Sequence, residues 1–122
     1  MSVADRSAWA DLVDSRAVAA GEVVAVDVGE REFVVWRTFE GAPCVMDARC
    51  PHQWSHLGAE GFVDGDELVC TAHFWRYDTA GHGCKLNMKG RRDPKADIEV
   101  FESREVDGRI EARLDEIPAM PA

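Results

Sequence analysis

CPHQWSHLGAEGFVDGDELVCTAHFW, residues 50–75, is the most informative stretch of this 122-residue sequence. It contains two short motifs, Cys50-Pro51-His52 and Cys70-Thr71-Ala72-His73, with 17 residues between them. Each motif offers one thiolate and one imidazole, and both groups are common metal ligands. A zinc finger usually pairs cysteine with cysteine on a hairpin and histidine with histidine on a helix, so the pairing here is crossed. The motifs therefore predict a metal site whose mixed ligands come from two loops.

The segments that flank the motifs are rich in β-branched and aromatic residues, which favour strands. Gly29-Glu30 is typical of a hairpin turn, and so is Asp64-Gly65-Asp66. The predicted strands are residues 22–28, 32–37, 42–48 and 67–70. The third leads into the first motif and the fourth into the second, so we expect each motif at the end of a strand.

The rest of the chain also favours strands. Residues 74–78 are predicted to be extended, and Gly81-His82-Gly83 to be a loop. Residues 96–114 alternate apolar and charged positions around an Asp-Gly turn, which indicates another hairpin. Residues 7–18 suggest a short turn of helix capped by Ser7. Six or more short strands with almost no helix predict an all-β fold, a small antiparallel β barrel or sandwich.

Composition and charge exclude several functions. No apolar run approaches the ~20 residues that a membrane-spanning helix needs. A net charge of -9 argues against nucleic acid and anionic membranes as partners, because both would repel an acidic surface. The first residues lack the basic start and apolar core of a signal peptide, so we expect a cytoplasmic protein.

The cysteines and the basic residues each allow two interpretations. Without an export signal, Cys44 and Cys84 are expected to be free thiols, although they could pair as a disulfide. Residues 89–95, KGRRDPK, form a basic cluster in an otherwise acidic chain. The cluster is either a solvated loop or a contact for an acidic partner.

The crossed pairing is explained when two irons share two loops, with both thiolates on one iron, both imidazoles on the other, and bridging sulfides between them. The spacing C-x-H, 17 residues, C-x-x-H resembles the Rieske [2Fe-2S] motif. The resemblance implies a Rieske-type β barrel or sandwich with one [2Fe-2S] cluster per chain. It implies a single domain over residues 1–122, with the cluster-binding part at about 48–88. The implied ligands are Cys50, His52, Cys70 and His73, with the cysteines on the buried iron and the histidines on the iron nearest solvent.

The resemblance also bears on the reduction potential. High-potential Rieske proteins carry a disulfide at positions that correspond here to Ser55 and Ala72, and a serine at the position of Trp75. Both features are absent, so we expect a potential at the low end of the Rieske range of roughly -150 to +300 mV. Tyr77 matches a tyrosine that hydrogen-bonds a cysteine sulfur in the high-potential group, but packing is its expected role. Trp75 and the neighbouring Phe74 form either an apolar collar around the cluster or part of the core.

Among Rieske proteins, the sequence is similar to free ferredoxins of multicomponent oxygenases. CPHQ at 50–53 and GHG at 81–83 resemble the ferredoxins of toluene monooxygenases, and the loop length resembles those of aromatic-ring dioxygenases. VVWR and GHGCK resemble the Rieske domains of steroid oxygenases. The resemblance implies an electron carrier without catalytic residues, which takes electrons from an NAD(P)H-dependent flavoprotein reductase and passes them to a terminal oxygenase or diiron monooxygenase in aromatic hydrocarbon catabolism. The alternative is a non-redox zinc or regulatory interaction module.

A few residues of the motif loops have expected roles of their own. Gly58, Gly61 and Gly65 are expected at positive φ or close backbone approaches that aim N–H groups at the sulfides. His56 is expected to pack its loop, and Trp54 to be exposed near the cluster.

Overall fold

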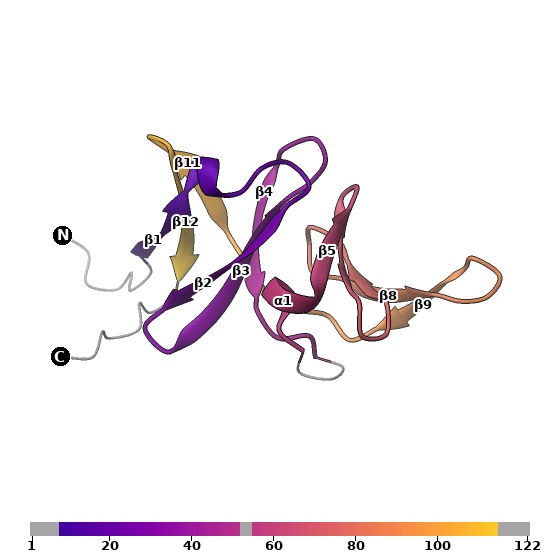
Figure 1. The fold of residues 1–122 in the computed structure, drawn as a ribbon. Helices are drawn as coiled ribbons and strands as arrows, with labels where there is room; N and C mark the ends of the chain where they lie inside the picture. Colours follow the sequence, from indigo (N-terminus) through magenta and orange to yellow (C-terminus); the bar gives the residue numbers. More distant parts are fainter. Residues whose placement is uncertain (1–7, 52–54, 115–122) are drawn as a thin grey trace.

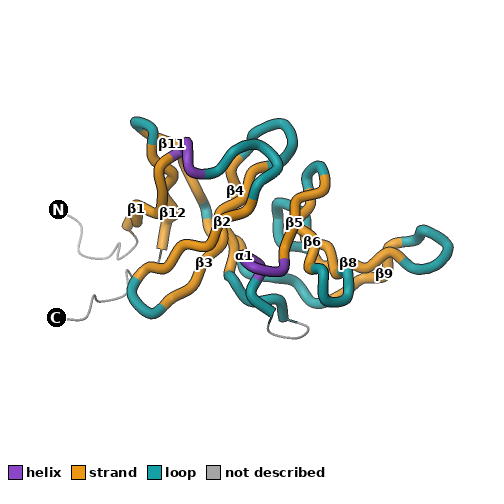
Figure 2. Tube along the Cα trace, viewed as in Figure 1, coloured by secondary structure: helices purple, strands orange, loops and turns teal. Residues whose placement is uncertain are grey.

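The computed structural model describes residues 8–51 and 55–114 of the chain. Their regular structure is almost entirely β-strand, as Figure 2 shows, and the strands pair antiparallel. The helical elements in these residues are a 3-10 turn, η1 (Ser15–Ala17), and a short helix, α1 (Leu57–Glu60). The all-β prediction is confirmed.

The strands form three sheets in the described part of the chain (Figure 1). The first sheet has the order β1–β12–β11, with β1 at Ala8–Asp14, β11 at Ser103–Val106 and β12 at Arg109–Leu114. The second has the order β10–β4–β3–β2, with β2 at Val23–Val28, β3 at Arg31–Arg37, β4 at Pro43–Asp47 and β10 at Val100–Phe101. The third has the order β5–β6–β7–β8–β9, with β5 at Gly61–Asp64, β6 at Glu67–Cys70, β7 at Trp75–Tyr77, β8 at Gly83–Leu86 and β9 at Arg92–Lys95.

Strand β3 contributes to two hydrophobic cores. Successive side chains of a strand point to opposite faces. Val34 and Trp36 therefore pack with residues of the third sheet, while Phe33 and Val35 pack with residues of the first. All four side chains are fully buried. This burial on both faces explains why β3 is a continuous apolar run without polar alternation.

Most predicted strands are confirmed. The predictions at 22–28, 32–37, 42–48 and 67–70 correspond to β2, β3, β4 and β6, with ends shifted by no more than one residue. The hairpin predicted within 96–114 is β11–β12.

The helical turn predicted for residues 7–18 is wrong. Residues Ala8–Asp14 form β1, which pairs along β12, and the alternate side chains of Ala10 and Leu12 are buried in the core. Pairing with a strand almost a hundred residues away overrides a weak local helix pattern. The 3-10 turn that follows is capped by Asp14, whose side chain accepts the Arg16 N–H at 2.8 Å; Ser7 lies outside the described residues.

The third sheet ends in a hairpin of β8 and β9, which projects away from the other two sheets (Figures 1 and 2). Gly83 is the first residue of β8 and not part of a loop. Residues 89–95, for which a solvated loop was one of two interpretations, are largely strand β9. Phe74 has φ of 60°, so the extended segment begins at Trp75. Neither of the two described helices has the length and apolar content to cross a membrane.

Candidate metal centre

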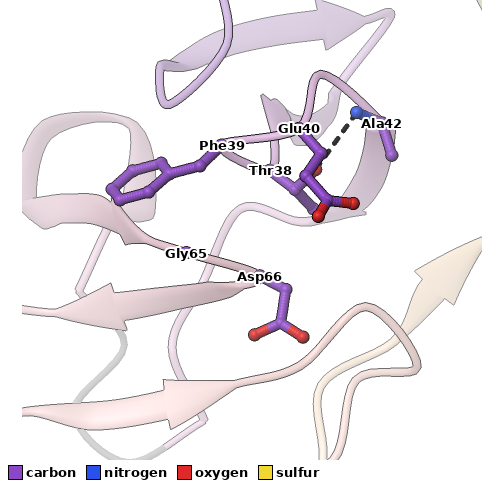
Figure 3. A pocket seen from close by; sticks show the side chains of 6 residues that line it. All are labelled: Thr38, Phe39, Glu40, Ala42, Gly65 and Asp66. Carbon is purple, nitrogen blue, oxygen red and sulfur yellow. Dashed lines mark hydrogen bonds between the residues drawn. The ribbon is translucent and has the colours of Figure 1, made fainter.

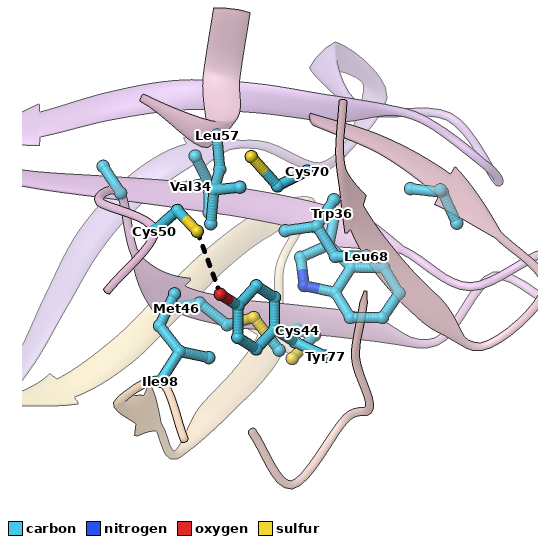
Figure 4. Packing of buried hydrophobic residues seen from close by; sticks show 12 residues of the cluster. Val34, Trp36, Cys44, Met46, Cys50, Leu57, Leu68, Cys70, Tyr77 and Ile98 are labelled. Carbon is cyan, nitrogen blue, oxygen red and sulfur yellow. Dashed lines mark hydrogen bonds between the residues drawn. The ribbon is translucent and has the colours of Figure 1, made fainter. Parts of the chain in front are cut away.

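The structure brings the two motif cysteines together in one core. Cys50 follows β4 by three residues, and Cys70 is the last residue of β6. Their relative exposures are 1% and 2%, and both belong to the core cluster shown in Figure 4. The prediction that each motif lies at the end of a strand is confirmed.

Tyr77 packs in the core cluster that contains the two cysteines. Its ring is fully buried, and its hydroxyl is hydrogen-bonded to Cys50 Sγ at 3.0 Å (Figure 4). Burial raises the pKa of Tyr77, and the contact with Cys50 raises it further. Tyr77 therefore packs in the core, as expected, and also hydrogen-bonds to the Cys50 sulfur.

Burial also raises the pKa of the Cys70 thiol, and the neighbouring Cys50 acts in the same direction. Hydrogen bonds from the backbone N–H groups of Ala72 and His73 act against this effect. These amides stabilise a thiolate at position 70, the protonation state that a metal requires.

The second motif forms a tight turn after β6. The Phe74 N–H donates to the Cys70 carbonyl at 2.8 Å, and the Thr71 N–H and hydroxyl donate to the Glu60 carbonyl. This turn places Phe74 at positive φ, a conformation that costs a non-glycine residue roughly 1–3 kcal/mol. The turn leaves the His73 side chain exposed while Cys70 points into the core. His52 and Trp54 of the first loop lie outside the described residues.

The first loop is closed by backbone bonds near both of its ends. The Cys50 N–H donates to the Ser55 carbonyl at 2.9 Å, and the Leu57 N–H donates to the Ala48 carbonyl at 2.7 Å. Between these bonds, Arg49 and His56 form an isolated β-bridge.

A side-chain cluster reinforces the closure, and we call it the Glu32 clasp (Glu32, Arg49 and His56). Arg49 Nη2 lies 3.0 Å from each carboxylate oxygen of Glu32, and His56 Nε2 lies 3.1 Å from Oε2. His56 Nδ1 accepts the Gly58 N–H at 2.9 Å, so Nε2 carries the proton and donates to Glu32. The expected loop-packing role of His56 is confirmed. The sequence contains no signal for Glu32, because it lies on β3, 17 residues before Arg49.

The glycines of this region allow close approaches but do not serve the site as expected. A Cβ at Gly58 would lie 2.8 Å from Ala25 Cβ, and one at Gly61 would collide with the Leu57 carbonyl oxygen. Gly65 has φ of +66° in the β5–β6 turn. The N–H of Gly58 is used by His56 and that of Gly61 by the Leu57 carbonyl. The expectation that these two amides point at sulfides is therefore wrong.

The two aromatic residues after His73, predicted to form either a collar around the cluster or part of the core, differ in their burial. Trp75 is half-buried and packs against the core that contains both cysteines, with Lys95 Nζ 5.6 Å from its ring centroid. Phe74 is 58% exposed, so its ring belongs to the surface beside His73.

The remaining cysteines are free thiols, as predicted. Burial raises the pKa of Cys44 to about 12, so its thiol stays protonated at neutral pH. Cys84 is half-buried and accepts a hydrogen bond from Arg92 Nη1 at 3.1 Å.

A concavity lies beside the first residues of β4 and β6, whereas the two cysteines lie at or after the last residues of these strands. It has a volume of about 380 Å³ and is formed by the β3–β4 and β5–β6 turns (Figure 3). Its lining consists of Thr38, Phe39, Glu40, Ala42, Gly65 and Asp66. The lining has neither cysteine nor histidine, so this cavity does not resemble a site for a soft metal.

The donor set around Cys50 and Cys70 fits an iron–sulfur cluster. Two thiols meet in a core that excludes water, and hydroxyl and amide groups lie ready to donate to their sulfurs. The exposed imidazole of His73 follows on the same turn. A cluster needs deprotonated thiolates, hydrogen bonds to sulfur and partial burial, and these residues supply all three.

Comparison with known proteins identifies several relatives of this chain. Cholesterol 7-desaturase nvd 1 of Ciona intestinalis is 32% identical over 102 residues, which cover 84% of this chain and 22% of that protein. The oxygenase component of 3-ketosteroid-9-alpha-monooxygenase from Rhodococcus rhodochrous is 30% identical, over 84% of this chain and 26% of that protein. The structure of the NdmA QL mutant of Pseudomonas putida CBB5 with theobromine matches with a TM-score of 0.75 at 29% identity, over 91% of this chain and 36% of that one.

The chain thus spans between about a fifth and about a third of the length of these relatives. The steroid-oxygenase likeness expected from VVWR and GHGCK agrees with two of them. A family model described as the Rieske [2Fe-2S] domain, a domain that binds a [2Fe-2S] cluster, matches residues 8–107. This match covers most of the chain, which belongs to the Rieske [2Fe-2S] domain family.

Proposed function

We propose that this chain is a Rieske ferredoxin, a one-electron carrier between a flavoprotein reductase and a terminal oxygenase. Membership of the family makes it an iron–sulfur electron-transfer domain. The observation that carries the finer proposal is the paired burial of Cys50 and Cys70 behind an exposed His73. Such an arrangement separates a water-free sulfur side from a histidine side that faces a partner.

The proposed cluster ligands are Cys50, His52, Cys70 and His73, within a single domain whose cluster-binding part is about residues 48–88. When bound, the cluster accepts and releases one electron at a time. The thiolates would hold it in the core, and the two imidazoles would hold it at the surface.

The residues around the ligands have separable roles. Tyr77 donates its hydroxyl proton to Cys50, because a thiolate has no proton to give. The Ala72 and His73 amides donate to Cys70. Leu57 and Trp75 pack against the same core and keep water from the sulfurs. His73 offers the short path by which an electron leaves.

The partners and location follow from this role. An NAD(P)H-dependent reductase would supply the electron, and a terminal oxygenase or diiron monooxygenase would receive it. Free thiols throughout the described residues support a reducing compartment such as the cytoplasm. A second candidate is an electron-transfer domain inside an oxygenase. The Rhodococcus relative favours it, because that protein is an oxygenase component of which this chain covers only 26%.

Metal analysis tests the cluster. Anaerobically purified protein should contain iron and acid-labile sulfide in equal amounts, and should give an EPR signal only after reduction. His73→Ala should abolish or transform that signal, whereas His82→Ala should leave it unchanged, since His82 is exposed on the β7–β8 turn. Zinc without iron would refute the proposal and favour a non-redox interaction module.

Turnover separates the carrier from the oxygenase domain. A purified reductase and a separate hydroxylase should sustain NADH-dependent substrate oxidation only when this protein is added. Reduction of the cluster without transfer to any separate hydroxylase would favour the second candidate.

A further inference from the structure

We propose that the β8–β9 hairpin (Gly83–Lys95) is the docking surface for an acidic patch on the redox partner protein. This inference rests on the proposed function, since it names the surface that the carrier presents. It is drawn from the charge, pairing and shape of the hairpin.

The hairpin carries charge opposite to the rest of the chain. Its 13 residues hold five cations and one carboxylate, a formal charge of +4 in a chain whose net charge is -9, which leaves -13 for the remainder. The cations are Lys85, Lys89, Arg91, Arg92 and Lys95. The hairpin is therefore a strongly positive segment of an otherwise acidic chain.

Four of these five cations differ from the other described cations in their pairing, the fifth being Arg92, which pairs with Glu67. Nine of the ten described arginines form an ion pair with a carboxylate, and Arg91 is the exception. Lys85 and Lys89 form no ion pair within the described residues, and Lys95 contacts the ring of Trp75 instead of a carboxylate. Elsewhere in residues 8–51 and 55–114 every arginine is paired with a carboxylate, whereas the hairpin leaves four cations available.

The hairpin tip is held in one conformation by bonds that do not involve these cations' side chains. Asn87 Oδ1 accepts the N–H groups of Lys89 and Arg91 at 2.8 and 3.0 Å. The backbone of Asn87 also bonds that of Gly90 and Arg91. A partner therefore meets a preorganised tip, which lowers the entropy cost of docking.

The tip combines charge with exposed apolar surface. Leu86 is 41% exposed and Met88 is completely exposed at the turn. Apolar anchors surrounded by charges are typical of transient protein interfaces. The hairpin that carries these residues projects away from the first and second sheets (Figures 1 and 2).

The base of the hairpin adjoins the metal centre. Trp75, two residues after His73, pairs with Lys85 in the sheet, and Lys95 lies over its ring. A partner that contacts the hairpin would therefore approach the side of the molecule where the electron leaves.

The surface fits a protein patch better than other occupants. Strand β9 is a sheet edge, but Pro94 lacks an N–H and charged side chains flank it, which disfavours the addition of a partner strand. A long polyanion such as DNA or an anionic bilayer would also meet the acidic remainder and be repelled. A compact acidic patch can engage the hairpin alone.

The first test uses a ten-residue polyglutamate peptide as the acidic probe. NMR spectra of the oxidised ¹⁵N-labelled protein at low ionic strength should show shifts concentrated at residues 83–95, and added salt should remove them. The double variant Lys89→Glu/Arg91→Glu should lose them. The control Arg16→Glu/Arg109→Glu makes the same charge change at the far side of the molecule and should retain them. Absent shifts, or equal losses in both variants, would overturn the proposal.

The second test measures electron release to charged one-electron oxidants. The net charge alone predicts that hexacyanoferrate(III) is repelled and reacts faster as salt rises. A docking hairpin predicts the reverse salt dependence, and a roughly 10-fold slower reaction in Lys89→Glu/Arg91→Glu at low salt. Hexaammineruthenium(III), a cation, should not be slowed by that variant. A hexacyanoferrate rate that rises with salt and is the same in the wild type and in Lys89→Glu/Arg91→Glu would contradict docking at the hairpin.

The two tests separate the docking proposal from the proposed function. A protein without iron would refute the carrier role, while the peptide titration would still decide whether the hairpin binds acidic protein. Sedimentation that shows a low-salt dimer abolished by Lys89→Glu/Arg91→Glu would make the occupant a second copy and overturn the proposal. Binding to phosphatidylserine vesicles but not to the peptide would overturn it in favour of a membrane.

Discussion

Tyr77 shows how one side chain can influence the whole centre. It packs with the core cysteines and its hydroxyl lies 3.0 Å from Cys50 Sγ. Hydrogen bonds to cluster sulfurs stabilise the more negative, reduced state and so raise the potential. The sequence indicated that Tyr77 matched such a position, but a hydrogen bond depends on how β7 lies beside the Cys50 loop, and that placement is not a local property.

The Tyr77→Phe variant should have a lower reduction potential, by about 60 mV if the bond shifts the redox equilibrium tenfold. Protein-film voltammetry measures this directly. Cys44→Ala is the control, because Cys44 is buried in the same core but its thiol contacts the Thr79 carbonyl instead. Equal potentials in wild type and Tyr77→Phe would show that the contact does not affect the cluster.

Glu32 binds two residues that flank the first loop. Its carboxylate contacts Arg49 and His56, so Glu32→Gln should weaken both interactions. The three side chains are partly exposed, so we expect a loss of about 1 kcal/mol in the free energy of unfolding, from the urea midpoint. Glu99→Gln breaks the more exposed pair with Arg31, at 3.9 Å, and should have almost no effect. An equal loss in both variants would refute a specific role for the Glu32 clasp.

Among the elements, the turns show most clearly where backbone and packing act together. Gly81 and Gly90 both have positive φ, +87° and +76°, but their surroundings differ. A Cβ at Gly81 would collide with the Ile98 carbonyl oxygen and lie 2.7 Å from Val100 Cγ2, whereas a Cβ at Gly90 would have no atom within 4 Å.

Gly90→Ala should therefore cost only the backbone strain, about 1–2 kcal/mol. Gly81→Ala should cost several kcal/mol, since the segment around Ile98 that leads to β10 must also move. Thermal unfolding of the two variants compares these effects. Similar melting temperatures would mean that the turn at Gly81 adapts without loss.

The elements also show how far the sequence could predict this fold. The strands β2, β3, β4 and β6 were predicted because their apolar content is high and turn residues bound them. Strand β1 was missed because it is stabilised by pairing with β12, a partner that a local window does not contain. The same limit applies to the site: the spacing of the motifs predicts the ligands, while the Glu32 clasp depends on contacts between β3 and the first loop, which lie far apart in the sequence.

Across the molecule, Arg37 connects the three-stranded sheet to the rest. Its side chain is largely buried and donates to the carbonyls of Val18, Gly41 and Ser15 and to the carboxylate of Glu105 on β11. The hydrogen bonds from Arg37 lower the pKa of Glu105 to about 2. One ion pair therefore holds β11 against the end of β3.

This ion pair should make stability depend on pH. The carboxyl pKa is near 4.5 in the unfolded chain and about 2 in the folded protein, so the folded state binds fewer protons in between. Its stabilisation is complete above pH 4.5 and is lost as the pH falls through about 2. Urea midpoints measured down this range should fall, and Glu105→Gln should flatten the decline. An unchanged slope in the variant would assign the acid sensitivity to other groups.

Strand β3 separates the two hydrophobic cores, and each of its faces completes one of them. Neither side can melt while the other remains intact, because loosening β3 exposes apolar surface on both sides at once. Backbone amides at Phe33–Trp36 should accordingly exchange with deuterium only on global unfolding. A substitution that loosens the core beside the cysteines would then also destabilise β1 and β12, which pack on the other face of β3.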